Sequence, residues 1–368
     1  MKRLHRPAGM LLALIVTCPA LAPGLASASP AGRGSGHVYT ATNAATGNSL
    51  LAFHRDRHGT LVAAGSYTTG GTGTGTALGS GHSVVASANG RLVLVVNAGS
   101  NSVSAFARLF GSLHRIGSAV GSDGATPTSV TIHDHLVYVM NARSGSIAGF
   151  RLSLRRGLVS IRGSTQPLSA AGVDTDSQIQ FDRNGRVLIV DQRGTANVLQ
   201  TFVIGRHGAA EPPQTIPSAG GGPFGFDVDE RGHILLSNVS IGDSSGASSY
   251  DVSRQGVLTE NGSPVASGES AACWLAAVGR YAYTTNAGSG SIGTFQVAGD
   301  GALSFTSTTP IAPDAKPLDE VGIPSGRLLY VLASGLNEIL GYRVGRGGTL
   351  TQVTSVVVPA GALGLGGS

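Results

Sequence analysis

Short stretches of β-forming residues follow one another along the chain, separated by turns rich in glycine, serine and asparagine. Seven stretches share one pattern: a β run ends in a small polar motif, restarts as a second β run and closes on an aromatic residue. The closing aromatics are Phe53, Phe106, Phe150, Phe202, Tyr250, Phe295 and Tyr342, which lie 53, 44, 52, 48, 45 and 47 residues apart. This period is typical of propeller blades of four antiparallel strands. The pattern therefore predicts an all-β, seven-bladed β-propeller.

The second repeat shows the four strands of one unit. Strands are expected over residues 83–86, 91–97, 103–107 and 115–120, with turns at 88–90, 99–102 and 111–113. Glycine and asparagine in these turns supply the positive φ angles that hairpins need. A β-sandwich would not repeat at this spacing, and no segment after residue 30 sustains the i, i+3, i+4 apolar pattern of a helical solenoid.

The two ends of the chain predict how the ring closes. The first repeat begins at its second strand, residues 37–43, so it lacks an innermost strand. The last repeat is complete by Val358, yet the chain continues to Ser368. We expect residues 360–366 to pair inside the first blade and to leave no open sheet edge.

The N-terminus has the pattern of a secretory signal peptide. A basic start precedes an apolar run over residues 8–16, and residues 26–28 form an A-x-A cleavage signal. The apolar run is too short to span a membrane. We expect residues 1–28 to be removed, residues 29–368 to form a single propeller domain, and the protein to be secreted. Cys18 invites a lipoprotein interpretation, but ordinary cleavage fits the signal better.

Charge and cysteine content narrow the range of partners. Without residues 1–28 the chain keeps 22 basic and 20 acidic residues, a net charge of +2. A nearly neutral surface gives no case for binding nucleic acid or acidic membranes, and we expect a monomer without a membrane span. Cys273, the one remaining cysteine, lies in an apolar stretch, which favours a buried structural thiol over a reactive one.

Turns that lead into the innermost strands should form a ring around one mouth of the central channel. We expect a small-molecule ligand there, because polar groups converge on a concave place. His82 is the candidate general base and Asp319 its orienting partner, while Gln178 and Asn238 could donate hydrogen bonds to a substrate. A hydrogen-bonded histidine at a strand edge is the simpler interpretation of His82.

Metal and cofactor motifs are weak in this chain. Asp174 and Asp176 could hold a cation but are better explained as turn formers, and Asp229 of the Asp227-x-Asp229 motif opens a hairpin. No spacing supplies enough His or carboxylate ligands for a metal, and no phosphate-binding glycine motif opens a helix. We expect neither a metal nor a cofactor.

Several motifs, in order and at blade spacing, resemble the lactonase family of seven-bladed propellers, which includes 6-phosphogluconolactonases and carboxymuconate cyclases. They are Pro223-Phe-Gly-Phe226, Ala247-Ser-Ser-Tyr250, Ala272-Cys-Trp274, residues 283–292 and Pro317-Leu-Asp319. The resemblance runs from about His37 to the end of the chain and is greatest to the exported bacterial branch. It implies a propeller that hydrolyses lactones.

This chain departs from the family pattern at the residues that the resemblance would make catalytic. Phosphogluconolactonase-like members carry Pro-His-x-His before one innermost strand and Arg-His before the next; here the corresponding segments are 174–178 and 223–225. Val239 stands where such members place Glu. The imidazole and guanidinium groups that would bind an acidic lactone are therefore absent from those positions.

Two functions remain open. The first is a secreted lactone hydrolase or cyclising enzyme that uses His82 and Asp319, with a histidine and a carboxylate within hydrogen-bond reach. The second is a non-catalytic extracellular binding or scaffold propeller, with an aromatic-lined pocket at Phe224 and Trp274. A structural module in a cell-surface assembly is a third interpretation, because a fold this widely reused does not decide function.

Overall fold

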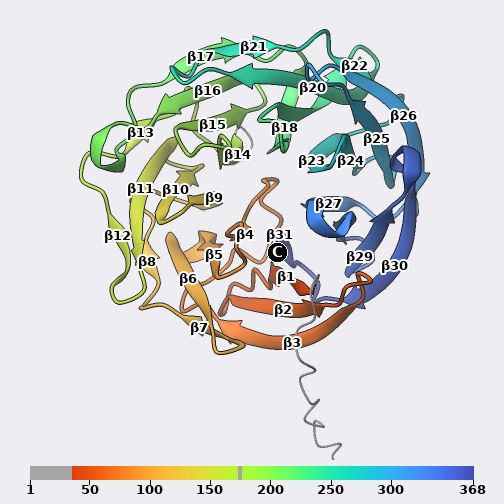
Figure 1. Cartoon of the computed structure of the whole chain (residues 1–368). Helices are drawn as coiled ribbons and strands as arrows, with labels where there is room; N and C mark the ends of the chain where they lie inside the picture. The colour runs from red at the N-terminus through yellow and green to blue at the C-terminus, as the bar shows by residue number, and fades with distance from the viewer. Residues whose placement is uncertain (1–34, 173–175) are drawn as a thin grey trace, which may run out of the picture. The chain divides into compact units, whose positions relative to one another are not determined.

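Seven antiparallel sheets form a ring in the computed structural model, which describes residues 35–172 and 176–368 (Figure 1). Each sheet is one blade with its innermost strand beside the central channel. The predicted seven-bladed β-propeller is confirmed. The predicted signal peptide and Cys18 lie outside the described residues, as does Asp174.

The strands of each blade are given from the channel outwards. Blade 1 has β31 (Leu363–Gly367), β1 (Gly36–Ala41), β2 (Ser49–Arg55) and β3 (Leu61–Thr68); blade 2 has β4 (Val84–Ala86), β5 (Leu92–Asn97), β6 (Ser102–Leu109) and β7 (Ser112–Arg115). Blade 3 has β9 (Pro127–His133), β10 (Leu136–Asn141), β11 (Ser146–Ser153) and β12 (Gly157–Ser160); blade 4 has β14 (Asp176–Phe181), β15 (Val187–Gln192), β16 (Val198–Val203) and β17 (Gln214–Pro217).

The remaining blades follow the same order. Blade 5 has β18 (Gly221–Val228), β19 (Ile234–Ile241), β20 (Ser244–Val252) and β21 (Leu258–Glu260); blade 6 has β23 (Ala272–Val278), β24 (Tyr281–Asn286), β25 (Ser291–Val297) and β26 (Leu303–Pro310); blade 7 has β27 (Pro317–Ile323), β28 (Leu328–Ala333), β29 (Glu338–Val344) and β30 (Leu350–Val357). Short strands β8 (Val120–Gly121), β13 (Gln166–Pro167) and β22 (Val265–Ala266) pair with β6, β11 and β20. Four short 3₁₀ turns complete the assignment: η1 (Ala98–Ser100), η2 (Arg206–Gly208), η3 (Pro324–Gly326) and η4 (Arg346–Gly348).

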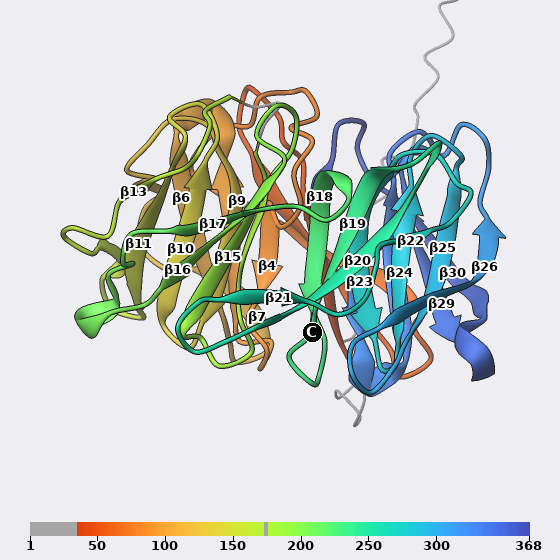
Figure 2. The ribbon, with the colours of Figure 1, turned by 90° about the horizontal axis from the view of Figure 1, so that it is seen from above.

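Antiparallel pairing gives the propeller two distinct faces. We call the face where the innermost strands begin the upper face; it also carries the turns between second and third strands. The lower face carries the turns between first and second strands and between third and fourth strands. Figure 2 shows β18 running from the upper face to the lower face.

The C-terminal strand closes the ring as predicted. β31 pairs antiparallel with β1, with Tyr39 opposite Gly366 and Ala41 opposite Leu363. Leu363 and Leu365 are buried. All the strands that the structure describes lie within residues 36–368.

Tyrosines near the start of the second strands join neighbouring blades. The hydroxyl groups of Tyr138, Tyr283 and Tyr330 donate to the carbonyl oxygens of Gly208, Gly348 and Gly59, each in the next blade around the ring, at 2.8, 3.0 and 2.8 Å. The rings of these tyrosines are fully buried. Each therefore adds a satisfied polar contact to an apolar interface between blades.

The repeated asparagine at the end of the second strand has a structural role. In three blades its buried side chain lies against a glycine of the connection that leads into the same blade: Asn97 against Gly71, Asn141 against Gly124 and Asn238 against Gly220. A side chain on the glycine would collide with the amide. The asparagine of the sequence repeat therefore packs each of these blades against the connection that leads into it.

Innermost strands begin with a left-handed backbone in five blades. The residues are His82, Thr126, Gly222, Ala271 and Lys316, with φ angles of 60°, 56°, 61°, 55° and 42°. This conformation is unusual for side chains other than Gly and Asn. Because it recurs from blade to blade, it belongs to the architecture of the turn and is not particular to His82.

The structure also tests the predictions about Cys273 and about membrane-spanning segments. Cys273 is buried, and burial raises the pKa of its thiol to about 12, which confirms the prediction of a buried thiol. Within residues 35–172 and 176–368, no helix is long and apolar enough to cross a bilayer.

Candidate functional site

The upper mouth of the channel is filled by the chain itself. The connection from β3 to β4, residues 69–83, reaches towards the centre of the ring (Figure 1). Gly81 in this connection is buried and lies against Gln178 and Trp274. Nη1 of Arg193 donates to the carbonyl oxygen of Gly79 at 2.6 Å. The predicted ring of turns does converge, and its centre is packed. Beside this packed centre, an open pocket of about 570 Å³ remains at the upper face, lined by residues that include Leu78, Thr126 and Arg193.

Phe224 and Trp274 form part of this packed layer. Their rings meet edge to face at 4.8 Å, and the guanidinium of Arg193 lies 4.2 Å from the centre of the Phe224 ring. Phe224 is 8% exposed and Trp274 is 4% exposed. These aromatics form a small apolar cluster with Cys273, and they do not line the central cavity.

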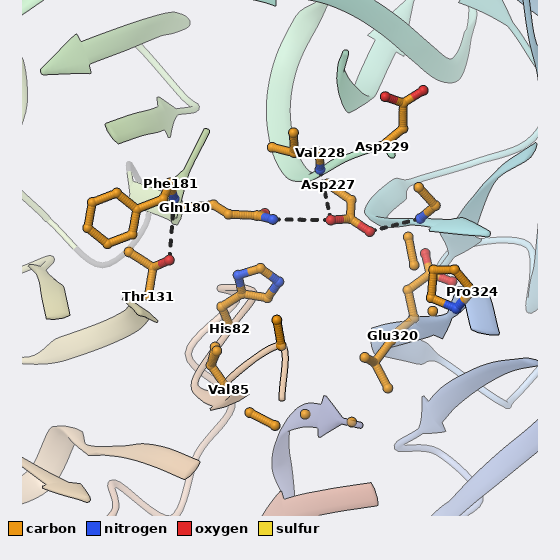
Figure 3. Close-up of a pocket in the computed structure, with 18 of the residues that line it drawn as sticks. His82, Val85, Thr131, Gln180, Phe181, Asp227, Val228, Asp229, Glu320 and Pro324 are labelled. Atoms are coloured by element: carbon orange, nitrogen blue, oxygen red, sulfur yellow. Dashed lines mark hydrogen bonds between the residues drawn. The ribbon is translucent and has the colours of Figure 1, made fainter. Parts of the chain in front are cut away.

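A cavity of about 380 Å³ occupies the channel below this layer and extends to the lower face. It is lined by all seven innermost strands and by turns of the lower face. Of the six predicted site residues, only His82 lines it. Figure 3 shows the His82 imidazole directed into the same space as Gln180, Asp227 and Glu320.

His82 has a neutral ring at ordinary pH. Burial lowers the pKa of its imidazole to about 4. Nδ1 is buried and has no hydrogen-bond partner in the part of the chain that the structure describes. The ring therefore keeps an unused polar atom inside the channel.

Asp319 binds backbone and does not orient the His82 ring. Oδ2 accepts from the amide N–H groups of His82 and Leu365 at 3.2 and 3.0 Å, and Oδ1 accepts from the amide of Glu320 at 3.0 Å. Burial raises the pKa of this carboxyl to about 7, although the three amides oppose the shift. Asp319 thus ties blade 7 to blade 2 and to the closing strand.

Gln178 and Asn238 are also engaged within the protein. The Gln178 side-chain amide donates to the backbone oxygen of Phe226 at 2.5 Å and accepts from its amide at 3.4 Å. Asn238 is fully buried and donates to Oγ of Ser218 at 3.4 Å. Neither side chain lines the cavity.

The sequence interpretation missed the acidic side of the cavity. Asp227 accepts from Nε2 of Gln180 at 3.1 Å and from the amides of Val228 and Ala277 at 2.8 and 2.9 Å, and burial raises the pKa of its carboxyl. The neighbouring Asp229 accepts from the amides of Arg231 and His233, as the hairpin interpretation predicted.

Glu320 is the most unusual carboxyl of the channel. It is 4% exposed, and neither oxygen has a partner with hydrogen-bond geometry among the described residues. Burial raises its pKa well above the ordinary value, and the carboxylates of Asp319 and Asp227 raise it further. The amides of Ala276 and Thr285 oppose this shift only in part. Two adjacent acidic residues in an innermost strand, 319 and 320, were the available sequence signal.

The channel interior suits a small, polar, uncharged molecule. A neutral imidazole, an amide and two carboxyl groups whose pKa values burial raises stand among small apolar residues of the innermost strands. The one arginine of the lining, Arg183, is exposed at the lower rim. Within the described residues, no three His, Cys, Asp or Glu side chains are grouped so that they could hold a metal ion.

A family model described as Lactonase, 7-bladed beta-propeller, matches residues 31–273, more than half of the chain. The chain therefore belongs to the lactonase family of seven-bladed propellers. No curated protein matches it.

Solved structures share the fold at low sequence identity. A proposed 6-phosphogluconolactonase of Bacteroides fragilis is 21% identical over 93% of this chain and 100% of its own, with a TM-score of 0.71. Another from Bacteroides uniformis is 19% identical over 91% and 100%, with a TM-score of 0.73. The periplasmic gluconolactonase of Pseudomonas aeruginosa is 16% identical over 90% and 99%, with a TM-score of 0.65. At these identities the likeness shows the fold alone.

Proposed function

We propose that the protein is an exported lactone hydrolase that acts on small, uncharged lactones in the central channel. The observation that carries the proposal is the pairing of a neutral His82 imidazole with a Glu320 carboxyl that favours its protonated form, both in one cavity. Environments that push the pKa values of two groups apart are typical of acid and base pairs in hydrolases. Membership of the lactonase family supports the reaction class.

Hydrolysis of a lactone needs a water molecule, a proton acceptor and a proton donor. His82 would accept a proton from the attacking water as the new C–O bond forms. Glu320 would donate a hydrogen bond to the carbonyl oxygen and then a proton to the ring oxygen as the ester C–O bond breaks. The proton on His82 then returns through water to Glu320. The product hydroxy acid has gained the elements of one water and both side chains regain their starting protonation states, so atoms and charge balance.

The residues of the channel also indicate that the substrate is uncharged. The positions where the resemblance places a His-rich motif and an Arg-His pair hold other residues in this chain. The channel interior also has no cationic group to receive a phosphate or a carboxylate, apart from Arg183 at the rim. A neutral lactone is therefore favoured over a phosphorylated one, and the signal pattern of residues 1–28 supports a role outside the cytoplasm.

Turnover of a panel of neutral sugar lactones and aliphatic lactones by residues 29–368 tests the proposal. His82→Ala and Glu320→Gln should each lower kcat/KM by roughly 100-fold or more, the usual size of a general acid or base effect. His82→Asn should give the same loss, and asparagine tolerates the left-handed backbone at this position. The matched controls, His135→Ala and Glu260→Gln, change exposed residues that do not line the cavity and should leave turnover intact.

The pH profile adds a second readout. Activity should fall below about pH 4, where His82 takes up a proton, and again at high pH, where Glu320 loses its proton. Full activity of both His82 variants would exclude this assignment of the base. Activity towards 6-phosphogluconolactone alone would overturn the proposed substrate class.

A non-catalytic binding propeller is the second candidate. It is favoured by the lack of a carboxylate partner on the His82 ring within the described chain, since Asp319 accepts from the backbone amide. If no lactone is turned over, binding of the same lactones should be measured by calorimetry. Binding that Glu320→Gln weakens, without turnover, would assign the cavity to this second function.

A further inference from the structure

Charge is distributed very unevenly around the ring, although the whole chain is nearly neutral. Residues 80–172, which form blades 2 and 3, contain eight arginines and only two acidic residues, Asp123 and Asp134. Asp123 accepts a hydrogen bond from the hydroxyl of Ser160. This sector therefore carries a positive charge of about +6, and the low net charge of the chain conceals it.

Of the seven exposed large apolar side chains among the described residues, four lie in the same sector, including the most exposed one, Phe110. Phe110, at the tip of the hairpin between β6 and β7, is fully exposed, and the adjacent Leu109 is 42% exposed. Leu154, at the tip of the hairpin between β11 and β12, is 59% exposed. A fully exposed aromatic at a hairpin tip gains nothing from folding, so a binding role is a better explanation.

Both hairpins connect third and fourth strands and therefore lie on the lower face. Blades 2 and 3 are neighbours in the ring (Figure 1), and Gly157 beside the second hairpin packs against the chain at Ile116 and Gly117. Arg155 and Arg156 flank Leu154 and are exposed. Arg108 donates to the carbonyl oxygen of Gly111 at 3.2 Å and braces the first hairpin.

We propose that these two hairpins dock the protein on an anionic lipid surface. The docking surface consists of Leu109, Phe110, Leu154, Arg155 and Arg156. Exposed apolar hairpin tips beside exposed arginines are a combination that binds lipid membranes, since the tips can enter the acyl boundary while the guanidinium groups meet lipid phosphates. A soluble polyanion would match the arginines but would leave Phe110 and Leu154 without a partner.

Sedimentation with vesicles tests the proposal on residues 29–368. The protein should bind vesicles of phosphatidylglycerol in phosphatidylcholine, should not bind phosphatidylcholine alone, and should be released by salt. Phe110→Ser with Leu154→Ser should weaken binding about tenfold or more. Arg155→Gln with Arg156→Gln should weaken it roughly fivefold for each arginine.

The equivalent hairpin of blade 5 supplies a matched control. It has an exposed Arg254 and an exposed Val257 between β20 and β21. Arg254→Gln with Val257→Ser should leave vesicle binding unchanged, and the circular dichroism spectra of all the variants should agree. Equal binding to neutral vesicles, or no binding to either, would overturn the proposal. Binding that the Phe110 and Leu154 changes leave intact would assign the arginines to a soluble polyanion instead.

Discussion

Replacing Glu320 by glutamine should stabilise the protein, by an amount that grows with pH. The Glu320 carboxyl is buried without a hydrogen-bond partner in the described chain, and its folded-state pKa is raised well above the ordinary 4.5. The folded protein therefore keeps a proton that the unfolded chain releases, so stability falls as pH rises between the two pKa values. Glutamine has nearly the same volume and no titrating proton.

The expected gain follows from proton linkage. Each pH unit above 4.5 and below the folded-state pKa adds about 1.4 kcal/mol to the free energy of unfolding of Glu320→Gln relative to wild type. Near pH 4 the difference should vanish, and it should grow with each pH unit above 4.5 until the folded-state pKa is reached. Even one such step is a noticeable share of the stability of an ordinary domain.

Urea unfolding measures the difference, with the fluorescence of Trp274, the only tryptophan, as the probe. Midpoints should be compared at pH 4, 5.5 and 6.5. Glu230→Gln, which changes an exposed glutamate on the lower rim, should show a difference near zero at every pH. A Glu320→Gln difference that stays constant across this range would refute the assignment of a raised pKa to Glu320.

Three further changes test the packing of the ring. Truncation after Val358 removes two buried leucines of β31 and should lower the free energy of unfolding by at least ~3–6 kcal/mol. Urea unfolding would detect this loss. A truncated chain as stable as the full one would contradict the role of the closing strand. Gly81→Ala should cost about 1–3 kcal/mol, because a Cβ at this position would overlap Gln178, and differential scanning calorimetry should show a lower Tm. Tyr138→Phe should cost about 1 kcal/mol through loss of its hydrogen bond to the next blade; an unchanged urea midpoint would show that this bond adds no net stability.

The repeat carried nearly all the information needed to predict the fold. Closing aromatics such as Phe150 and Phe295 lie buried in third strands, and the residues after Val358 pair where the missing strand required. These features follow from local patterns that recur at a fixed period. Prediction of the ring closure needed only a count of strands at the two ends.

The candidate site was harder to predict because the sequence does not show how far down the channel each side chain lies. The turns at His82 and Trp274 do meet, but the sequence does not say that their side chains fill the upper mouth and leave a cavity below it. From the sequence alone, Asp319 and Asn238 resemble catalytic or substrate-binding residues. In the structure, both form hydrogen bonds with other groups of the protein. Glu320 gains its character from burial, which only the packed structure reveals.

Both ends of the described propeller chain meet at one place. The amide and carbonyl of His37 exchange hydrogen bonds with Ser368, at 3.3 and 3.0 Å, and Gly36 lies directly against Ser368. A short peptide linker between residues 368 and 36 would therefore make the ring covalently continuous. The chain could then be reopened at a turn of another blade, and the order of blades in the sequence would change while their order in space stayed the same. The first blade, which contains both the first and the last described strand, has the same four-stranded order as the other blades.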